Sequence, residues 1–181
     1  ETVLYHRQKD VGIITLNRPH RLNAINLDLL KGFMEQLDRA KQDTKARVII
    51  LTGEGKAFCA GEDLKETASG KSMEQWMDEA QRLQDVQRMT MKLGKPIIAA
   101  MSGYALGGGC EFAMGCDIRI ASETAVLGFP ETTVGMTVTN AGTKLLPHLV
   151  GLGKAKELVL TGDFIDAFEA QRIGLVNKVV A

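Results

Sequence analysis

The sequence has few cysteines, no excess of charge of either sign and no long hydrophobic run. Its three cysteines, Cys59, Cys110 and Cys116, lie in apolar surroundings without a C-x-x-C pair, which argues against a disulfide framework or a zinc site. Lysine plus arginine equals aspartate plus glutamate at 22 each, so no net charge favours nucleic acid or an anionic membrane. We therefore expect reduced, buried thiols in a protein that binds neither nucleic acid nor membrane.

The sequence also lacks a charged-then-apolar leader, and no apolar run reaches transmembrane length. These two absences predict a cytoplasmic protein, or a mitochondrial-matrix protein whose leader is missing. A length of 181 residues and an apolar content of 45% are typical of one soluble domain.

Strand-like and helix-like segments alternate along the chain. Thr2–Arg7 and Val11–Leu16 predict a hairpin, whereas Arg47–Thr52 and Ile97–Met101 are typical of buried strands. Apolar residues at helical spacing predict a long helix over Ser72–Leu93. This alternation predicts an α/β fold whose strands are largely parallel. Further elements are expected as a helix capped by Asn26 or Asp28, helices over Asn140–Leu149, Gly153–Leu160 and Asp166–Arg172, and a strand over Leu175–Val180.

The stretch from Pro96 to Asp117 has the least ordinary local pattern. A buried strand leads into a glycine-rich turn, Gly103–Gly109, and small apolar residues then resume as a helix with one carboxylate, Glu111. A helix that begins on glycines exposes backbone N–H groups at its positive end, where a negative or developing charge is stabilised. The alternative is an ordinary tight turn with a solvated Glu111.

Three features predict a catalytic site if the fold brings them together. Ala60–Leu64 is a strand end that turns into a loop, Gly107–Gly109 opens a helix, and Glu111 and Glu131 are carboxylates in apolar contexts. Buried carboxylates have raised pKa values, and two close carboxylates titrate separately, so one can hold a proton while the other accepts one. Spacing alone does not bring the two together, and solvated or ion-paired glutamates are the alternative.

Several motifs also occur in a fixed order along the chain. They are Asn17-Arg18-Pro19 with Leu22-Asn23-Ala24, an F-x-A-G-x-D-L-K loop at Phe58–Lys65, a G-x-A-x-G-G-G-x-E turn at Gly103–Glu111, Thr161-Gly162, and Gly174-Leu175-Val176. Together they resemble the enoyl-CoA hydratase/isomerase (crotonase) superfamily, and the resemblance covers essentially the whole chain.

The resemblance implies a crotonase-like α/β fold, a spiral of ββα units with two near-perpendicular sheets, as one core domain over residues 1–181. It implies hydration of a 2-enoyl-CoA thioester to a 3-hydroxyacyl-CoA, with coenzyme A as part of the substrate and no metal or redox cofactor. The backbone N–H groups of Glu62 and Gly108 would form an oxyanion hole for the thioester oxygen. Glu111 would help water attack C3, and Glu131 would protonate C2.

The resemblance also implies where the acyl-CoA thioester and other subunits bind. The implied substrate and CoA contacts are Arg21, Leu22, Ala24, Ala60, Asp63, Leu64, Lys65 and Gly107, with Lys65 or Arg21 near a phosphate. Members of the family form homotrimers or hexamers through C-terminal helices. Those helices are expected to be missing or truncated in a chain that stops at Ala181.

The match departs from the family in the loop behind Glu131. Where the family has G-x-x-P-G-x-G-G-T, Gly135–Thr143 lacks the proline and two of the glycines. Thr137, Thr139 or Asn140 could recognise a polar or cyclic acyl group, and an ordinary helix cap is the alternative.

Other functions are compatible with the same motifs. Isomerisation, hydrolysis or C–C cleavage of an acyl-CoA could use the same scaffold, and isomerisation needs only one well-positioned base. Non-catalytic binding of acyl-CoA is an alternative of a different class. A dinucleotide-binding fold is disfavoured because no G-x-G-x-x-G follows the first strand.

Overall fold

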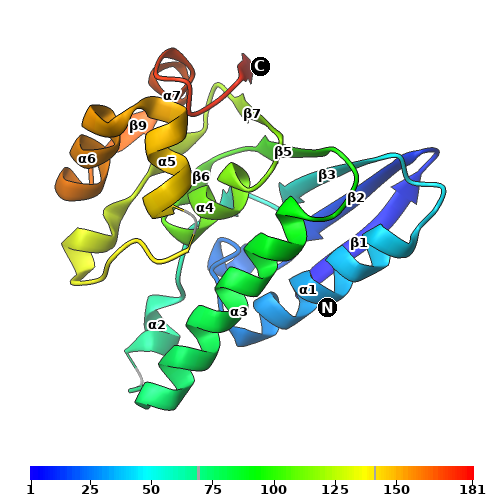
Figure 1. Ribbon diagram of the computed structural model, residues 1–181, viewed down its shortest axis with the longest axis horizontal. Coiled ribbons are helices and arrows are strands. Elements are labelled where there is room, and N and C mark those ends of the chain that lie inside the picture. The colour runs from blue at the N-terminus through cyan, green and yellow to red at the C-terminus, as the bar shows by residue number, and fades with distance from the viewer. Residues whose placement is uncertain (69, 141) are drawn as a thin grey trace.

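The computed structural model describes residues 1–68, 70–140 and 142–181. Over these residues the chain forms an α/β structure with two sheets (Figure 1). The larger sheet has the strand order β1 (Val3–Gln8), β2 (Val11–Leu16), β3 (Val48–Gly53), β5 (Ile97–Met101), β7 (Ile118–Ser122) and β10 (Lys178–Val180). The smaller sheet has the order β4 (Ala57–Cys59), β6 (Tyr104–Leu106), β8 (Val126–Gly128) and β9 (Phe164–Asp166).

Most neighbouring strands in both sheets are parallel, as the alternation of elements predicts. In the larger sheet β1 and β2 form the expected antiparallel hairpin, and every other pair is parallel. In the smaller sheet β4, β6 and β8 are parallel, and only β9 runs antiparallel to its neighbour. The α/β class and the division into two sheets are therefore confirmed.

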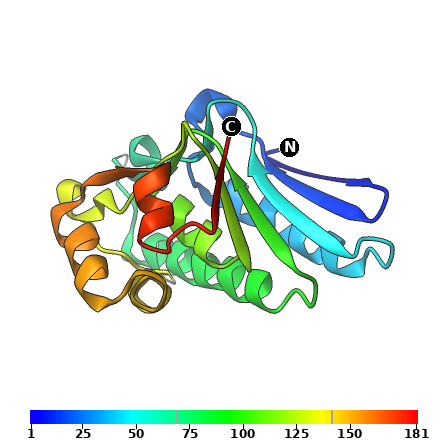
Figure 2. The same cartoon turned by 90° about the horizontal axis from the view of Figure 1, so that it is seen from above.

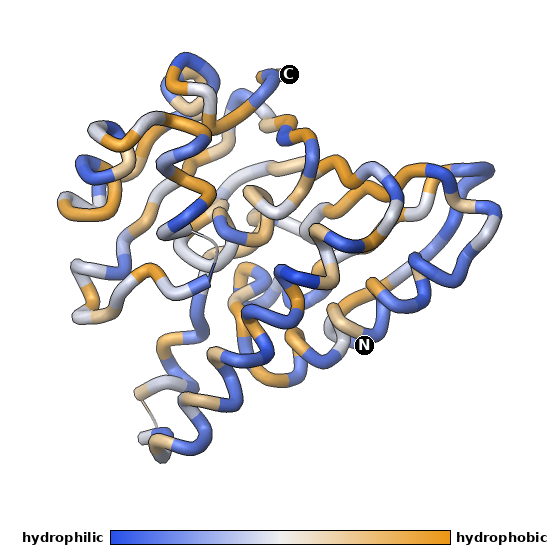
Figure 3. The backbone as a smooth tube through the Cα atoms, viewed as in Figure 1, coloured by the Kyte–Doolittle hydropathy of each residue, from blue (hydrophilic) through white to orange (hydrophobic). Residues whose placement is uncertain are grey.

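Two long amphipathic helices pack beside each other next to the larger sheet. Helix α1 (Leu27–Gln42) contacts β1, β2 and helix α3 (Met73–Met91). Figure 2 shows the strands of the larger sheet above these helices, and Figure 3 shows both helices alternating between hydrophilic and hydrophobic residues. Asn26, rather than Asp28, caps α1, because its side chain accepts a hydrogen bond from the N–H of Leu29. Ser72 and Gln75 form a capping box at the start of α3.

A short central helix and a set of peripheral helices complete the fold. Helix α4 (Gly108–Met114) is buried at the centre, where Phe112 makes an edge-to-face contact with Phe33 of α1 at 5.2 Å between ring centroids. The peripheral elements are α2 (Leu64–Thr67), α5 (Gly142–Val150), α6 (Leu152–Thr161), α7 (Ala167–Arg172) and the 3₁₀ turns η1 (Pro19–Arg21) and η2 (Pro130–Val134). Helices α5 to α7 gather at the end of the molecule opposite the β1–β2 hairpin (Figures 1 and 2).

The structure corrects two predicted boundaries. The strand expected over Leu175–Val180 comprises only Lys178–Val180, because the backbone N–H of Val176 bonds the carbonyl of Ala170 in α7 instead of a neighbouring strand. The helix expected from Asn140 begins at Gly142, and Ala141 lies outside the described residues. The glycine turn contains an unpredicted strand, β6.

The predicted burial of the thiols is confirmed, because all three cysteines are free and buried. Burial also raises the pKa of each thiol, which disfavours the reactive thiolate. Within the part of the chain that the structure describes, none of the helices combines the length and apolarity that a membrane crossing needs.

Candidate active site

The loop that follows β4 lies directly against the end of β6. Gly61 has a φ of +87°, and a Cβ atom at this position would be 2.9 Å from the carbonyl oxygen of Leu106. On its other side the loop bonds Ile25, whose N–H donates to Gly61 and whose carbonyl accepts from Asp63. These contacts fix the backbone on both sides of Glu62. Among the described residues, the backbone N–H of Glu62 donates no turn or loop hydrogen bond.

The first turn of α4 packs against the end of β4. Gly109 has no room for a side chain, because a Cβ atom there would be 2.1 Å from the carbonyl oxygen of Cys59. Gly107, the N-cap, has a φ of +50°, and a Cβ atom at this position would be 3.1 Å from Oε1 of Glu131. The N–H of Gly108 begins the helix, where no intrahelical acceptor exists. Two strand ends therefore bring the Glu62 loop and the α4 N-terminus to one place.

A cleft of about 810 Å³, including its open mouth, extends from this junction. Both candidate carboxylates and both candidate N–H donors belong to its lining. The described lining residues are Ile25, Ala60, Gly61, Glu62, Leu64, Trp76, Glu79, Ala80, Leu83, Gly107, Gly108, Glu111, Pro130, Glu131, Val134, Met136, Thr137 and Thr139. Within the described ranges, no group of three His, Cys, Asp or Glu side chains is arranged to hold a metal ion.

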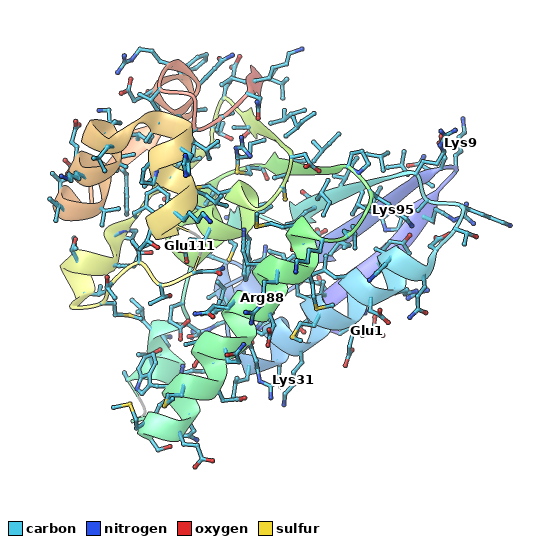
Figure 4. The ribbon with its side chains drawn as sticks, in the orientation of Figure 1. Glu1, Lys9, Lys31, Arg88, Lys95 and Glu111 are labelled. Atoms are coloured by element: carbon cyan, nitrogen blue, oxygen red, sulfur yellow. The ribbon has the colours of Figure 1, made fainter. Side chains whose placement is uncertain are left out.

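Glu111 is almost fully buried on α4 at the point where α5 begins (Figure 4). Its Oε1 accepts hydrogen bonds from the backbone N–H groups of Asn140, at 3.0 Å, and Gly142, at 2.8 Å. Its pKa is raised to about 7, mainly by burial; the two N–H donors oppose this rise, and the charge of Glu131 adds to it. Glu111 therefore titrates near neutral pH and changes protonation state easily.

Glu131 lies on η2 and lines the same cleft as Glu111, which lies on α4. Its Oε2 is buried and has no hydrogen-bond partner among the described residues. Burial raises its pKa, and a backbone hydrogen bond partly opposes that rise. A carboxyl oxygen without a donor favours the protonated form, whereas the two N–H donors at Glu111 favour the ionised form. The two carboxyl groups thus differ in their hydrogen-bond donors, and this difference allows one to act as the base and the other as the acid.

Three of the implied substrate contacts, Ala60, Leu64 and Gly107, line the cleft. The other five, Arg21, Leu22, Ala24, Asp63 and Lys65, are not among its described lining residues. They lie around the loop behind it: Leu22 and Lys65 are exposed, and Ala24 is buried.

Asp63 is part of a buried ion-pair network. Its carboxylate bonds the guanidinium of Arg18 at 3.2 Å and that of Arg21, and it also caps α2 through the N–H of Lys65. Burial alone would raise the pKa of Asp63, but the hydrogen bonds from Arg21 and Arg18 outweigh this and lower it. Asp63 therefore holds the loop in shape, and Arg18, which the motif analysis did not assign a role, shares that task.

Helix α3 contributes a wall of the cleft that sequence analysis did not assign to the site. Trp76, Glu79, Ala80 and Leu83 line it from this helix. Trp76 and Leu83 belong to the apolar stripe that predicts the helix, and Glu79 occupies the same face. A carboxylate on the apolar face of a helix is the signal that could have identified this wall.

The loop that departs from the family pattern still reaches the site. Thr137 and Thr139 line the cleft, and the backbone of Asn140 and Gly142 holds Glu111. Ala141, between those two donors, lies outside the described residues. Although this loop lacks the proline and two glycines of the family pattern, its backbone still donates two hydrogen bonds to the carboxylate of Glu111.

Comparison with known proteins gives a consistent result over nearly the whole chain. The sequence model of the enoyl-CoA hydratase/isomerase family matches residues 6–181. A short-chain-enoyl-CoA hydratase from Clostridium acetobutylicum is 45% identical over 179 residues, covering 98% of this chain and 68% of the relative. A crotonyl-CoA hydratase from Syntrophomonas wolfei is 42% identical, covering 99% of this chain and 69% of the relative.

A solved structure extends the similarity from sequence to fold. The crystal structure of an enoyl-CoA hydratase from Bacillus anthracis superposes with a TM-score of 0.95 at 43% sequence identity. The superposition covers 99% of this chain and 70% of that chain. The fold implied by the motifs is therefore confirmed, and the relatives are longer than the chain described here.

Proposed function

The chain belongs to the enoyl-CoA hydratase/isomerase family as a hydratase-like lyase, and from this premise we propose that it adds water to a 2-enoyl-CoA thioester. The product is a 3-hydroxyacyl-CoA. The observation that carries the proposal is that one cleft is lined by the buried carboxylate of Glu111, by the half-buried Glu131, and by the Glu62 loop and the start of α4. Hydration needs both an acid and a base, whereas isomerisation needs only one well-positioned base.

The N–H groups of Glu62 and Gly108 are proposed to receive the thioester oxygen. Attack of water on C3 moves negative charge onto that oxygen as an enolate forms. Donors that are already fixed before the reaction stabilise this charge without reorganisation, and each contributes about 3 kcal/mol. The contacts of Gly61 with Leu106 and of Gly109 with Cys59 are what fix them here.

Glu111 and Glu131 are proposed to divide the proton transfers. Ionised Glu111 accepts a proton from water as the water oxygen bonds C3, and protonated Glu131 gives its proton to C2. The N–H donors at Glu111 and the unpartnered Oε2 of Glu131 support this order of roles. After the reaction Glu111 holds a proton and Glu131 does not, and exchange with solvent restores the starting state.

The CoA part of the substrate is proposed to lie along the Glu62–Lys65 loop and the turn at Arg21 to Ala24. Leu22 and Lys65 are exposed there, so the Lys65 ammonium is accessible to a phosphate. Arg21 contributes less charge to a phosphate because its guanidinium is already bonded to Asp63. The proposed reaction uses no metal or redox cofactor, and coenzyme A enters only as part of the substrate.

The direct test is spectroscopic. Crotonyl-CoA and a set of longer, branched and aromatic 2-enoyl-CoAs are mixed with the protein, and loss of the conjugated thioester absorbance is followed. Glu111→Gln and Glu131→Gln should each lower kcat by about a thousandfold, whereas the exposed Glu123→Gln should not change it. No loss of absorbance with any substrate would contradict hydration, and a gain of absorbance from a 3-enoyl-CoA with full activity of Glu131→Gln would indicate isomerisation.

A further inference from the structure

A buried polar cluster forms one wall of the cleft beside the proposed oxyanion hole. The ammonium of Lys71 bonds Glu62 Oε1 at 2.9 Å, Glu79 Oε2 at 2.5 Å and Thr67 Oγ1 at 3.5 Å. The same ammonium lies 4.8 Å from the centroid of the Trp76 ring. An ammonium group has three N–H donors, so the three oxygen partners use all of them.

Among the described residues, one oxygen of this cluster has no hydrogen-bond partner. Glu79 is 2% exposed, and its Oε1 accepts no hydrogen bond within the described part of the chain. A buried acceptor without a donor costs about 1 to 3 kcal/mol, so the fold retains it at a loss of stability. Glu79 lines the cleft together with Trp76, Ala80 and Leu83, which are largely apolar neighbours on the same helix.

The surroundings of Glu79 are rich in acceptors and poor in donors. Glu62 and Glu79 share the single ammonium of Lys71, so the cluster carries a net negative charge when both carboxylates are ionised. The pKa of Glu62 is raised to about 7, mainly by burial and then by the neighbouring Glu79 carboxyl group, while Lys71 lowers it. Because no described residue donates to Glu79 Oε1, a donor for this oxygen would have to come from a ligand in the cleft.

We propose that Glu79 determines the acyl specificity of the enzyme by accepting a hydrogen bond, through Oε1, from a hydroxyl group on the acyl chain of the substrate. The inference rests on the proposed function, because it requires an acyl thioester in the cleft. An all-hydrocarbon acyl chain along α3 leaves this buried oxygen without a donor. A site built to bond a hydroxyl group discriminates strongly against the analogue that lacks it.

An isosteric substitution gives the sharpest test. Lys71 requires an oxygen at the Oε2 position, so Glu79→Gln should direct its amide oxygen to Lys71 and its NH₂ group into the cleft. The acceptor that faces the acyl chain is then replaced by a donor of the same size. Saturated thioesters that cannot react serve as probes: hexanoyl-CoA, and 4- or 5-substituted hexanoyl-CoA with either a hydroxyl group or a ketone at the same carbon.

The measurement is the affinity of each probe by titration calorimetry. The wild-type protein should bind a hydroxyl probe about tenfold more tightly than the matching ketone, and Glu79→Gln should remove or reverse that preference. Glu79→Leu should favour hexanoyl-CoA over both. Glu74→Gln, on the exposed face of the same helix, is the matched control and should retain the wild-type preference.

Two outcomes overturn the inference. One is equal binding of hydroxyl and ketone probes by the wild-type protein at both positions; the other is an unchanged preference in Glu79→Gln that folds normally by circular dichroism. Failure of the proposed function is separate. A protein that hydrates hex-2-enoyl-CoA without discriminating the probes contradicts only the role of Glu79, and one that discriminates them without turnover contradicts only hydration.

Discussion

At the scale of single residues, Glu111 links the proposed chemistry to the stability of the fold. Its pKa is raised to about 7, mainly by burial, from an ordinary value of 4.5. A folded-state pKa above the unfolded value means that the folded state favours the protonated form. The stabilising contribution of Glu111 is therefore fully present below pH 4.5 and is lost as the pH rises to about 7.

Glu111→Gln should become more stable relative to the wild-type protein as the pH rises through this window. Glutamine cannot ionise, and its amide oxygen can still accept from Asn140 and Gly142. Between pH 4.5 and 8 the difference in unfolding free energy should shift by about 3 kcal/mol in favour of the variant. Urea unfolding at both pH values measures this shift, and Glu123→Gln should show none.

Asp63 belongs to a motif that implies substrate binding, and a substitution can show whether it contacts the substrate or supports the loop. Its carboxylate is 2% exposed and is bonded to both Arg18 and Arg21. Asp63→Asn should cost about 3 to 5 kcal/mol of stability, because it leaves buried guanidinium charge without its partner. Urea unfolding gives the cost, while KM measured on the folded fraction separates a direct contact from support of the loop. A stable variant with a large rise in KM would assign Asp63 to the substrate.

At the scale of elements, the sequence predicts those helices and strands whose pattern is long or chemically unusual. The hairpin, α1 and α3 have enough residues for a period to be visible, and the glycines Gly107–Gly109 mark the start of α4. Strands β6, β8 and β9 have three residues each, which is too short for a period-two pattern. They form because neighbouring strands supply their hydrogen bonds, and that information is not local.

The junction of α4 with β4 gives a prediction at this scale. A Cβ atom on Gly109 would be 2.1 Å from a backbone oxygen, so Gly109→Ala must move α4 away from Cys59. We expect a loss of about 1 to 3 kcal/mol of stability and a large fall in kcat, because Gly108 and Glu111 move with the helix. Gly153→Ala in α6 is the matched control: nothing lies within 4 Å of its Cβ position, and alanine favours the helix. Equal activity of the two variants would contradict the proposed role of the junction.

At the scale of the whole molecule, four segments that are far apart in sequence line the cleft. The Glu62 loop, α3, the start of α4 and the segment from Pro130 to Thr139 each supply part of its lining. Motif order predicted three of these segments, because each contains a residue type tied to a known chemistry. The α3 wall was not predicted, since only the packing of α3 against the other segments brings Trp76 and Glu79 to the cleft.

A ligand that fills such a cleft should stabilise the whole fold rather than one element. Butyryl-CoA, a saturated thioester that cannot be hydrated, should contact all four segments at once, and unfolding of any of them would release it. At about 100 times its dissociation constant, it should add about 2.7 kcal/mol to the unfolding free energy and raise Tm by about 5 to 10 °C. Coenzyme A without an acyl group should give a smaller rise, since it leaves the wall of α3 empty. Dialysis against EDTA should change neither Tm nor the rate of crotonyl-CoA hydration, because the proposed chemistry uses only side-chain carboxylates and backbone N–H groups. A rise in Tm with coenzyme A equal to that with butyryl-CoA would show that the acyl group does not enter the cleft.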